Sequence, residues 1–68
     1  MTDDEITKTR ADLHELQVEH RDLDLVIAHL AENPPRDELL VRRLKKRKLL
    51  LKDRIDSLER LLVPDVLA

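Results

Sequence analysis

Apolar side chains recur along the chain at alternating intervals of three and four residues, in two separate stretches. The first stretch has its seam positions at Ile6, Thr9, Leu13, Leu16, His20, Leu23, Ile27 and Leu30. The second repeats the spacing at Val41, Leu44, Lys48, Leu51, Ile55, Leu58 and Leu62. This is the a/d heptad pattern of helices that pair along a narrow apolar stripe. The pattern therefore predicts two long, seam-bearing helices.

The two stretches are separated by Asn33-Pro34-Pro35, a strong helix-breaking signal. Proline lacks an N–H donor and disfavours helix at the residue before it. Asp37 or a neighbour is expected to cap the helix that follows. A tight loop between two seamed helices predicts an all-α, antiparallel, coiled-coil-like hairpin. The expected single domain over 1–68 consists of a helix at about 3–32, a loop at 33–36, a second helix at about 37–62 and a tail at 63–68.

The seams predict a register in which Leu30 lies beside Val41 and Leu16 lies opposite Ile55. That register brings opposite charges together at three flanking pairs, Asp24 with Lys45, Arg10 with Glu59, and Glu19 with Arg54. Each exposed pair contributes only about 0.2–1 kcal/mol, so these pairs select the register more than they stabilise the fold.

The charge is divided unequally between the two halves of the chain. Residues 1–33 carry 9 acids and 3 bases, a net −6, and residues 34–68 carry 10 bases and 6 acids, a net +4, which sum to −2. The first helix is therefore the natural electrostatic partner of the second. This supports the hairpin independently of the apolar pattern.

Several apolar residues fall outside both seams. Four of them occupy outer heptad positions: Val18, Leu25, Leu49 and Leu50. The others are Val26, Leu39, Leu40 and Leu61. Exposed apolar patches usually mark interfaces, and a chain of 68 residues without cysteine buries little surface alone. We therefore expect self-association, most simply two hairpins in a four-helix bundle; a groove for a partner helix fits the same residues.

The second helix holds a run of bases that has two interpretations. Its candidate contacts to nucleic acid are Arg42, Arg43, Lys45, Lys46, Arg47 and Lys52. Lysine and arginine at this density bind phosphate by releasing counterions. Alternatively, the run is a solvated helix face offset by the acidic first helix, or it meets an acidic protein partner. The net charge of −2 and the lack of aromatic residues favour the solvated face.

Two ionisable residues interrupt the apolar seams, His20 in the first helix and Lys48 in the second. A polar residue at a seam position commonly sets register and oligomeric state at some cost in stability. Histidine can also act as a pH-sensitive group. The lysine stem can lie along the seam while its ammonium reaches solvent, Asp24 or Glu19. The structural role is the favoured interpretation of both residues.

The sequence holds no pattern typical of an active site. Without cysteine, glycine or aromatic residues, it lacks a thiolate metal site, a phosphate-binding glycine loop and a base-stacking platform. His14-Glu15 begins like a zinc-protease helix motif, but Val18 stands where the second histidine is needed. Ser57 has no histidine nearby in the sequence. We expect no enzyme activity, no metal or other cofactor, and no small-molecule substrate.

The expected location is the cytoplasm. The longest uncharged apolar run, residues 49–51, is far too short to span a membrane, so no membrane association is expected. The acidic residues 3–5 contrast with the basic start of a signal peptide. The absence of cysteine fits a reducing compartment.

Two segments stand out as specific: the Glu19-His20 pair, and the run from Leu44 to Asp53, which matches Leu-Lys-Lys-x-Lys-Leu-x-Leu-Lys-Asp throughout. In both segments the chain resembles the YdcH-like family of small bacterial proteins, which carry a domain of unknown function. The resemblance covers roughly residues 13–62. It implies a helical hairpin in a bacterial protein and brings no established activity.

The sequence therefore predicts a small interaction module that self-associates, favouring a dimer, and binds a protein partner. The alternative is a nucleic-acid or ribosome-associated protein that uses the basic second helix. The tail at Val66-Leu67-Ala68 is expected to fold back over Ile6, or else to serve as a recognition segment for a protease or adaptor.

Overall fold

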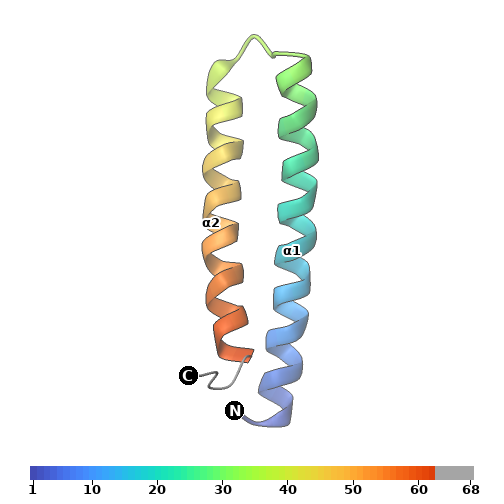
Figure 1. Cartoon of the computed structure of the whole chain (residues 1–68), viewed down its shortest axis with the longest axis vertical. Helices are drawn as coiled ribbons and strands as arrows, with labels where there is room; N and C mark the ends of the chain where they lie inside the picture. Colours follow the sequence, from blue (N-terminus) through green and yellow to red (C-terminus); the bar gives the residue numbers. More distant parts are fainter. Residues whose placement is uncertain (63–68) are drawn as a thin grey trace.

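The computed structural model describes residues 1–62, which form two α-helices joined by a short loop (Figure 1). Helix α1 spans Asp3–Glu32 and helix α2 spans Glu38–Leu62. The helices run antiparallel, side by side, in a hairpin whose longest extent is 48 Å. The predicted all-α helical hairpin is confirmed. The predicted contact between the tail and Ile6 lies outside the described residues.

A capping box fixes the start of α1. The Glu5 backbone N–H donates to Thr2 Oγ1 over 3.2 Å, and the Thr2 backbone N–H donates to Glu5 Oε1 over 3.4 Å. These bonds satisfy donors that have no partner inside the helix. Asp3 and Asp4 add negative charge at the positive end of the helix dipole.

Hydrogen bonds from polar groups cap the helix ends on both sides of the loop. The backbone and side-chain amides of Asn33 both donate to the His29 carbonyl oxygen, over 2.9 and 3.2 Å. Beyond the two prolines, the Leu39 N–H donates to Asp37 Oδ1 over 2.9 Å. Asp37 therefore caps α2, as predicted. The break reverses the chain, so the two seams face each other.

Burial follows the predicted seams closely. All fifteen seam positions are buried or half-buried, and outside the seams this holds in residues 1–62 only for Asp24, Pro35 and Asp56. Leu51 is 1% exposed and Ile55 is 6% exposed, and these two residues form the core. The heptad pattern is therefore confirmed along the described chain. A single hairpin nevertheless buries very little apolar surface by itself.

The contacts between the helices agree with the predicted register. Leu16 of α1 lines a hollow together with Arg54 and Leu58 of α2. Ile55, the residue predicted to lie opposite Leu16, comes between these two residues in the sequence. Lys48 of α2 reaches Asp24 of α1, as that register also allows.

The predicted flanking ion pairs were wrong in detail. Within residues 1–62, Asp24 pairs with Lys48 instead of Lys45, Glu19 pairs with Arg47 instead of Arg54, and Arg10 makes no ion pair with Glu59. Arg47 and Arg54 occupy the same row of α2, one heptad apart, so the heptad pattern does not select between them. Lys48 lies in the seam, nearer to α1 than Lys45 is.

Candidate interaction surfaces

The seam divides the rest of the hairpin into two faces. Successive residues of an α-helix turn by about 100°, so heptad positions e and b flank one edge of the seam, and positions g and c flank the other. In an antiparallel pair, the e rows of both helices border one face, and the g rows border the opposite face. We call these the e/b face and the g/c face. The f positions point away from the neighbouring helix.

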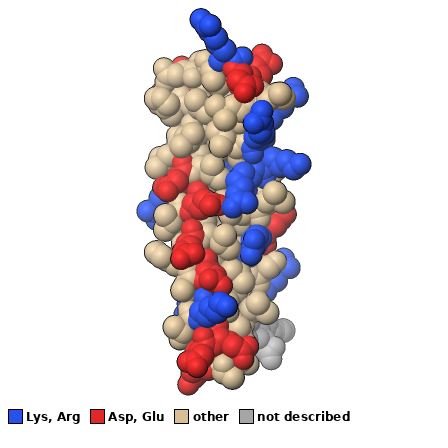
Figure 2. Space-filling view, turned by 180° about the vertical axis from the view of Figure 1, so that it is seen from behind, with Lys and Arg blue, Asp and Glu red and all other residues tan. Residues whose placement is uncertain are grey.

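The g/c face is divided by charge. Helix α1 contributes an acidic column made of Glu5, Asp12, Glu15, Glu19 and Asp22. Helix α2 contributes a basic column made of Arg43, Arg47 and Arg54. Lys8 is the one lysine or arginine among the g and c positions of α1, and those positions of α2 hold no acid. Figure 2 shows this face, with Asp and Glu gathered along one side and Lys and Arg along the other.

One ion pair joins the two columns. Arg47 Nη2 lies 2.9 Å from Glu19 Oε2, and the two side chains remain 55% and 46% exposed. An ion pair this exposed contributes little to the stability of the hairpin. Both charged groups keep room for a further partner, so the columns are not neutralised by their contact with each other.

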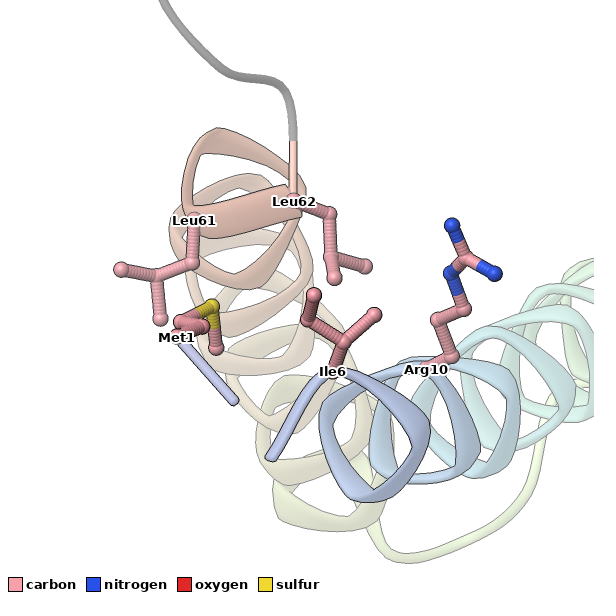
Figure 3. A pocket seen from close by; sticks show the side chains of 5 residues that line it. All are labelled: Met1, Ile6, Arg10, Leu61 and Leu62. Atoms are coloured by element: carbon pink, nitrogen blue, oxygen red, sulfur yellow. The ribbon is translucent and has the colours of Figure 1, made fainter. Parts of the chain in front are cut away.

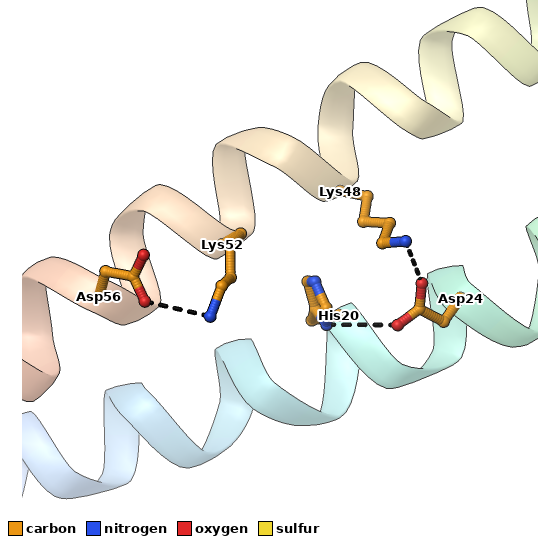
Figure 4. Close-up of polar contacts among 5 residues, drawn as sticks. All are labelled: His20, Asp24, Lys48, Lys52 and Asp56. Atoms are coloured by element: carbon orange, nitrogen blue, oxygen red, sulfur yellow. Dashed lines mark ion pairs between the residues drawn. The ribbon is translucent and has the colours of Figure 1, made fainter.

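The e/b face mixes the two signs along both helices. Its bases are Arg10 and Arg21 on α1 and Arg42, Lys45 and Lys52 on α2. Its acids are Asp3 and Asp24 on α1 and Glu38, Asp56 and Glu59 on α2. Lys52 pairs with Asp56 along α2 over 3.2 Å (Figure 4). The e/b face is therefore not divided into an acidic side and a basic side.

A polar layer crosses the seam near the middle of the hairpin. His20 and Lys48, the two ionisable seam residues, both point toward Asp24 (Figure 4). Asp24 Oδ2 lies 3.6 Å from His20 Nδ1, and Oδ1 pairs with the Lys48 ammonium. The contact with Lys48 lowers the pKa of the Asp24 carboxyl, against an opposing effect of desolvation and with a smaller contribution from His20. Asp24 therefore lies between the Lys48 ammonium and the His20 imidazole.

This geometry predicts an acid dependence of stability that belongs to Asp24. A carboxyl whose pKa is lower in the folded protein stabilises the fold above its unfolded pKa of about 4. That contribution is lost as the pH falls through the lower, folded pKa. Urea midpoints measured at pH 6 and at pH 3 should therefore differ less for Asp24→Asn than for the wild type.

The matched control is Asp53→Asn, which removes a carboxylate that makes no ion pair within residues 1–62. It should keep the wild-type difference between the two pH values. An Asp24→Asn variant with the full wild-type difference would show that Lys48 and His20 do not stabilise the ionised Asp24.

The four leucine and valine residues predicted as a partner site do not form one patch. Leu50 lies on the g/c face, 50% exposed, and Leu49 lies on the e/b face, 65% exposed. Val18 and Leu25 lie at f positions, on the side of α1 turned away from α2. Three residues missed as a group accompany Leu50 on the g/c face, namely Val26, Leu40 and Leu61. Their heptad letters were the signal that could have grouped them.

The six bases predicted to contact nucleic acid also divide between surfaces. Arg43 and Arg47 lie on the g/c face, Lys46 lies at an f position, and the e/b face holds Arg42, Lys45 and Lys52. Within residues 1–62, only Arg47 and Lys52 of these six make ion pairs. The bases therefore surround α2 and do not form a single stripe.

Comparison with known protein families matches residues 13–59 to a family described as a protein of unknown function, DUF465. The chain belongs to the DUF465 family. YdcH-like proteins are DUF465 proteins, so the predicted resemblance is confirmed. Comparisons with curated proteins and with solved structures gave no match. The segment shared with DUF465 contains the polar layer, the loop and both core residues.

The open end of this DUF465 hairpin carries a hollow between its helices (Figure 3). Its lining residues are Met1, Ile6, Arg10, Leu61 and Leu62. Ile6 and Leu62 point toward each other across it. Most of this apolar end lies outside the family match.

No helix within residues 1–62 is both long and apolar enough to cross a membrane.

Proposed function

We propose that this DUF465 protein is a cytoplasmic interaction module that self-associates and binds a protein partner. One observation carries the proposal: within residues 1–62, nine large apolar side chains are 37–65% exposed, whereas only two residues are buried. Burial of apolar surface contributes roughly 25 cal/mol per Å², and a lone hairpin leaves most of that contribution unused. Association with a second chain recovers it.

The alternative function is binding to nucleic acid or to a ribosomal surface. The observation that favours it is the set of four bases with no ion pair in the described chain, Arg42, Arg43, Lys45 and Lys46. The opposing observations are the absence of aromatic side chains and the net charge of −2. We therefore rank this function second.

Two matched variants of α2 separate the functions. In Leu49→Gln/Leu50→Gln, exposed apolar surface is removed, and we expect the dissociation constant of the assembly to rise by at least about tenfold. In Lys45→Gln/Lys46→Gln/Lys52→Gln, the leucines are kept, so the assembly should survive. If nucleic acid is bound, this second variant should bind it more weakly and with a shallower salt slope.

Sedimentation velocity over a concentration series gives the assembly state of each variant, and pull-down with and without nuclease gives the partner class. A wild-type chain that stays monomeric at every concentration and recovers no protein would contradict the interaction module. Ribosomal proteins or RNA that disappear on nuclease treatment would instead support the alternative.

A further inference from the structure

We infer that the g/c face is the surface through which two copies of this chain meet. The two hairpins lie face to face with their loops at the same end, related by a twofold axis parallel to the helices. Each acidic column then faces the basic column of the other copy. This inference rests on the proposed self-association and specifies its surface and its geometry.

The sign pattern selects this arrangement. A twofold axis parallel to the helices exchanges the left and right sides of a face as the face turns to meet its copy. The acidic column of α1 therefore meets the partner's basic column, twice, by symmetry. A twofold axis running across the helices would place acid against acid and base against base. Complementary charges favour the first arrangement and oppose the second.

The levels of the charges along the hairpin also match. An axis parallel to the helices preserves height, so each residue meets partner residues at its own level. In the register supported by the hollow that Leu16, Arg54 and Leu58 line together, Glu19 lies near the level of Arg54. Asp22 lies near the level of Arg47 in the same register. Glu19 therefore faces the partner's Arg54, and Asp22 faces the partner's Arg47. Each α1 also runs antiparallel to the facing α2, as in an up-and-down four-helix bundle.

Apolar side chains interrupt the charged columns at several levels. Leu40, Val26, Leu50 and Leu61 are 37%, 45%, 50% and 59% exposed on this face. The face is 48 Å long, and two helix diameters make it roughly 20 Å wide. That area exceeds the roughly 800 Å² per partner of a standard specific interface.

The e/b face does not suit a second copy in this way. Each helix carries as many acids as bases there, so a twofold contact would bring no acidic column against a basic column. The two faces of one hairpin therefore differ in what they can bind. The g/c face is self-complementary, and the e/b face, with Leu49, remains open in the dimer.

Charge reversal on the full-length chain tests the inference. The first variant, Arg43→Glu/Arg54→Glu, makes the basic column acidic and leaves the Glu19–Arg47 pair intact. The second, Glu15→Lys/Asp22→Lys, makes the acidic column basic. Each variant alone should raise the dimer dissociation constant by at least about tenfold, because symmetry doubles every repulsive contact. An equimolar mixture should dimerise again, because each copy then presents the opposite charge to the other.

The control is Arg42→Glu/Lys46→Glu, which changes the net charge equally but lies on the e/b face and at an f position. It should leave the dissociation constant within about twofold of wild type.

A second matched pair of variants separates the two faces: Leu50→Gln should weaken the dimer, whereas Leu49→Gln should not. Sedimentation equilibrium measures the constants, and circular dichroism reports helicity. A single chain that carries both reversals again has one acidic and one basic column, so it should dimerise like the wild type. This variant tests the interface even if either reversal alone unfolds the protein.

The outcomes separate the two proposals. A wild-type dimer that both reversals weaken and their mixture restores supports the g/c interface. A wild-type dimer that the control weakens as much as the reversals, or that the mixture does not restore, overturns this interface while self-association stands. A wild-type chain that remains monomeric overturns the interface together with self-association.

Discussion

Leu51→Ala is expected to destabilise the protein by about 3 kcal/mol, a loss large enough to leave the chain mostly unfolded at 25 °C. Leu51 is the largest fully buried side chain, at 1% exposure, and it lies beside the polar layer in the middle of the hairpin. Truncating a buried leucine loses the transfer free energy of three carbons and leaves a cavity. A domain this small has little stability to spare.

The neighbouring leucine is the matched control for this prediction. Leu50→Ala removes the same atoms from a side chain that is 50% exposed, one residue away on the same helix. At protein concentrations where the chain is monomeric, we expect it to change the free energy of unfolding by less than about 0.5 kcal/mol. Urea unfolding followed by circular dichroism measures both variants. Equal losses for Leu50→Ala and Leu51→Ala would mean that the seam is not the core.

The sequence was sufficient to predict the fold because one signal repeats along both helices. A seam of fifteen positions interrupted only by Asn33-Pro34-Pro35 leaves few ways to bury its apolar side chains. The caps agree with it, since Thr2 and Asp37 hold the helix starts where their side chains can accept backbone hydrogen bonds. Local signals and the long-range pattern therefore point to the same hairpin.

The ion pairs could not be predicted at the same resolution. A heptad assigns a side chain to a row, but a long arginine or lysine reaches acids at more than one level of that row. Glu19 is within reach of either Arg47 or Arg54 by row, and the structure pairs it with Arg47. The energies involved are small, so several pairings have nearly equal free energies. Exposed pairs of this kind follow from side-chain geometry and not from sequence spacing.

The sequence indicated which types of residue are exposed, but it did not indicate which of them share a surface. Leu49 and Leu50 are adjacent in sequence, but a turn of about 100° puts them on opposite faces of the hairpin. The charge division of the g/c face similarly emerges only when the rows of two helices are placed side by side. Net charge by half-chain indicated that α1 attracts α2. It did not indicate that the same charges are left exposed for a second copy.

The polar layer gives the other large expected effect. His20→Leu/Lys48→Leu would replace both ionisable seam residues with apolar ones, and we expect a gain of about 2 kcal/mol in the free energy of unfolding. His20 and Lys48 are 23% and 36% exposed, so each leucine would be largely buried. Asp24 would lose its contacts with His20 and Lys48, but at 44% exposure the carboxylate stays hydrated, so the loss costs little.

The same variant is expected to form a mixture of oligomeric states. Polar seam residues penalise arrangements that bury them without a partner, and a continuous leucine seam removes that penalty. Sedimentation velocity should therefore show several oligomers where the wild type shows one. Lys52→Leu, at a position 57% exposed outside the seam, is the control and should not raise the urea midpoint. A less stable His20→Leu/Lys48→Leu variant would mean that the contacts of Asp24 with His20 and Lys48 contribute more than the apolar burial that replaces them.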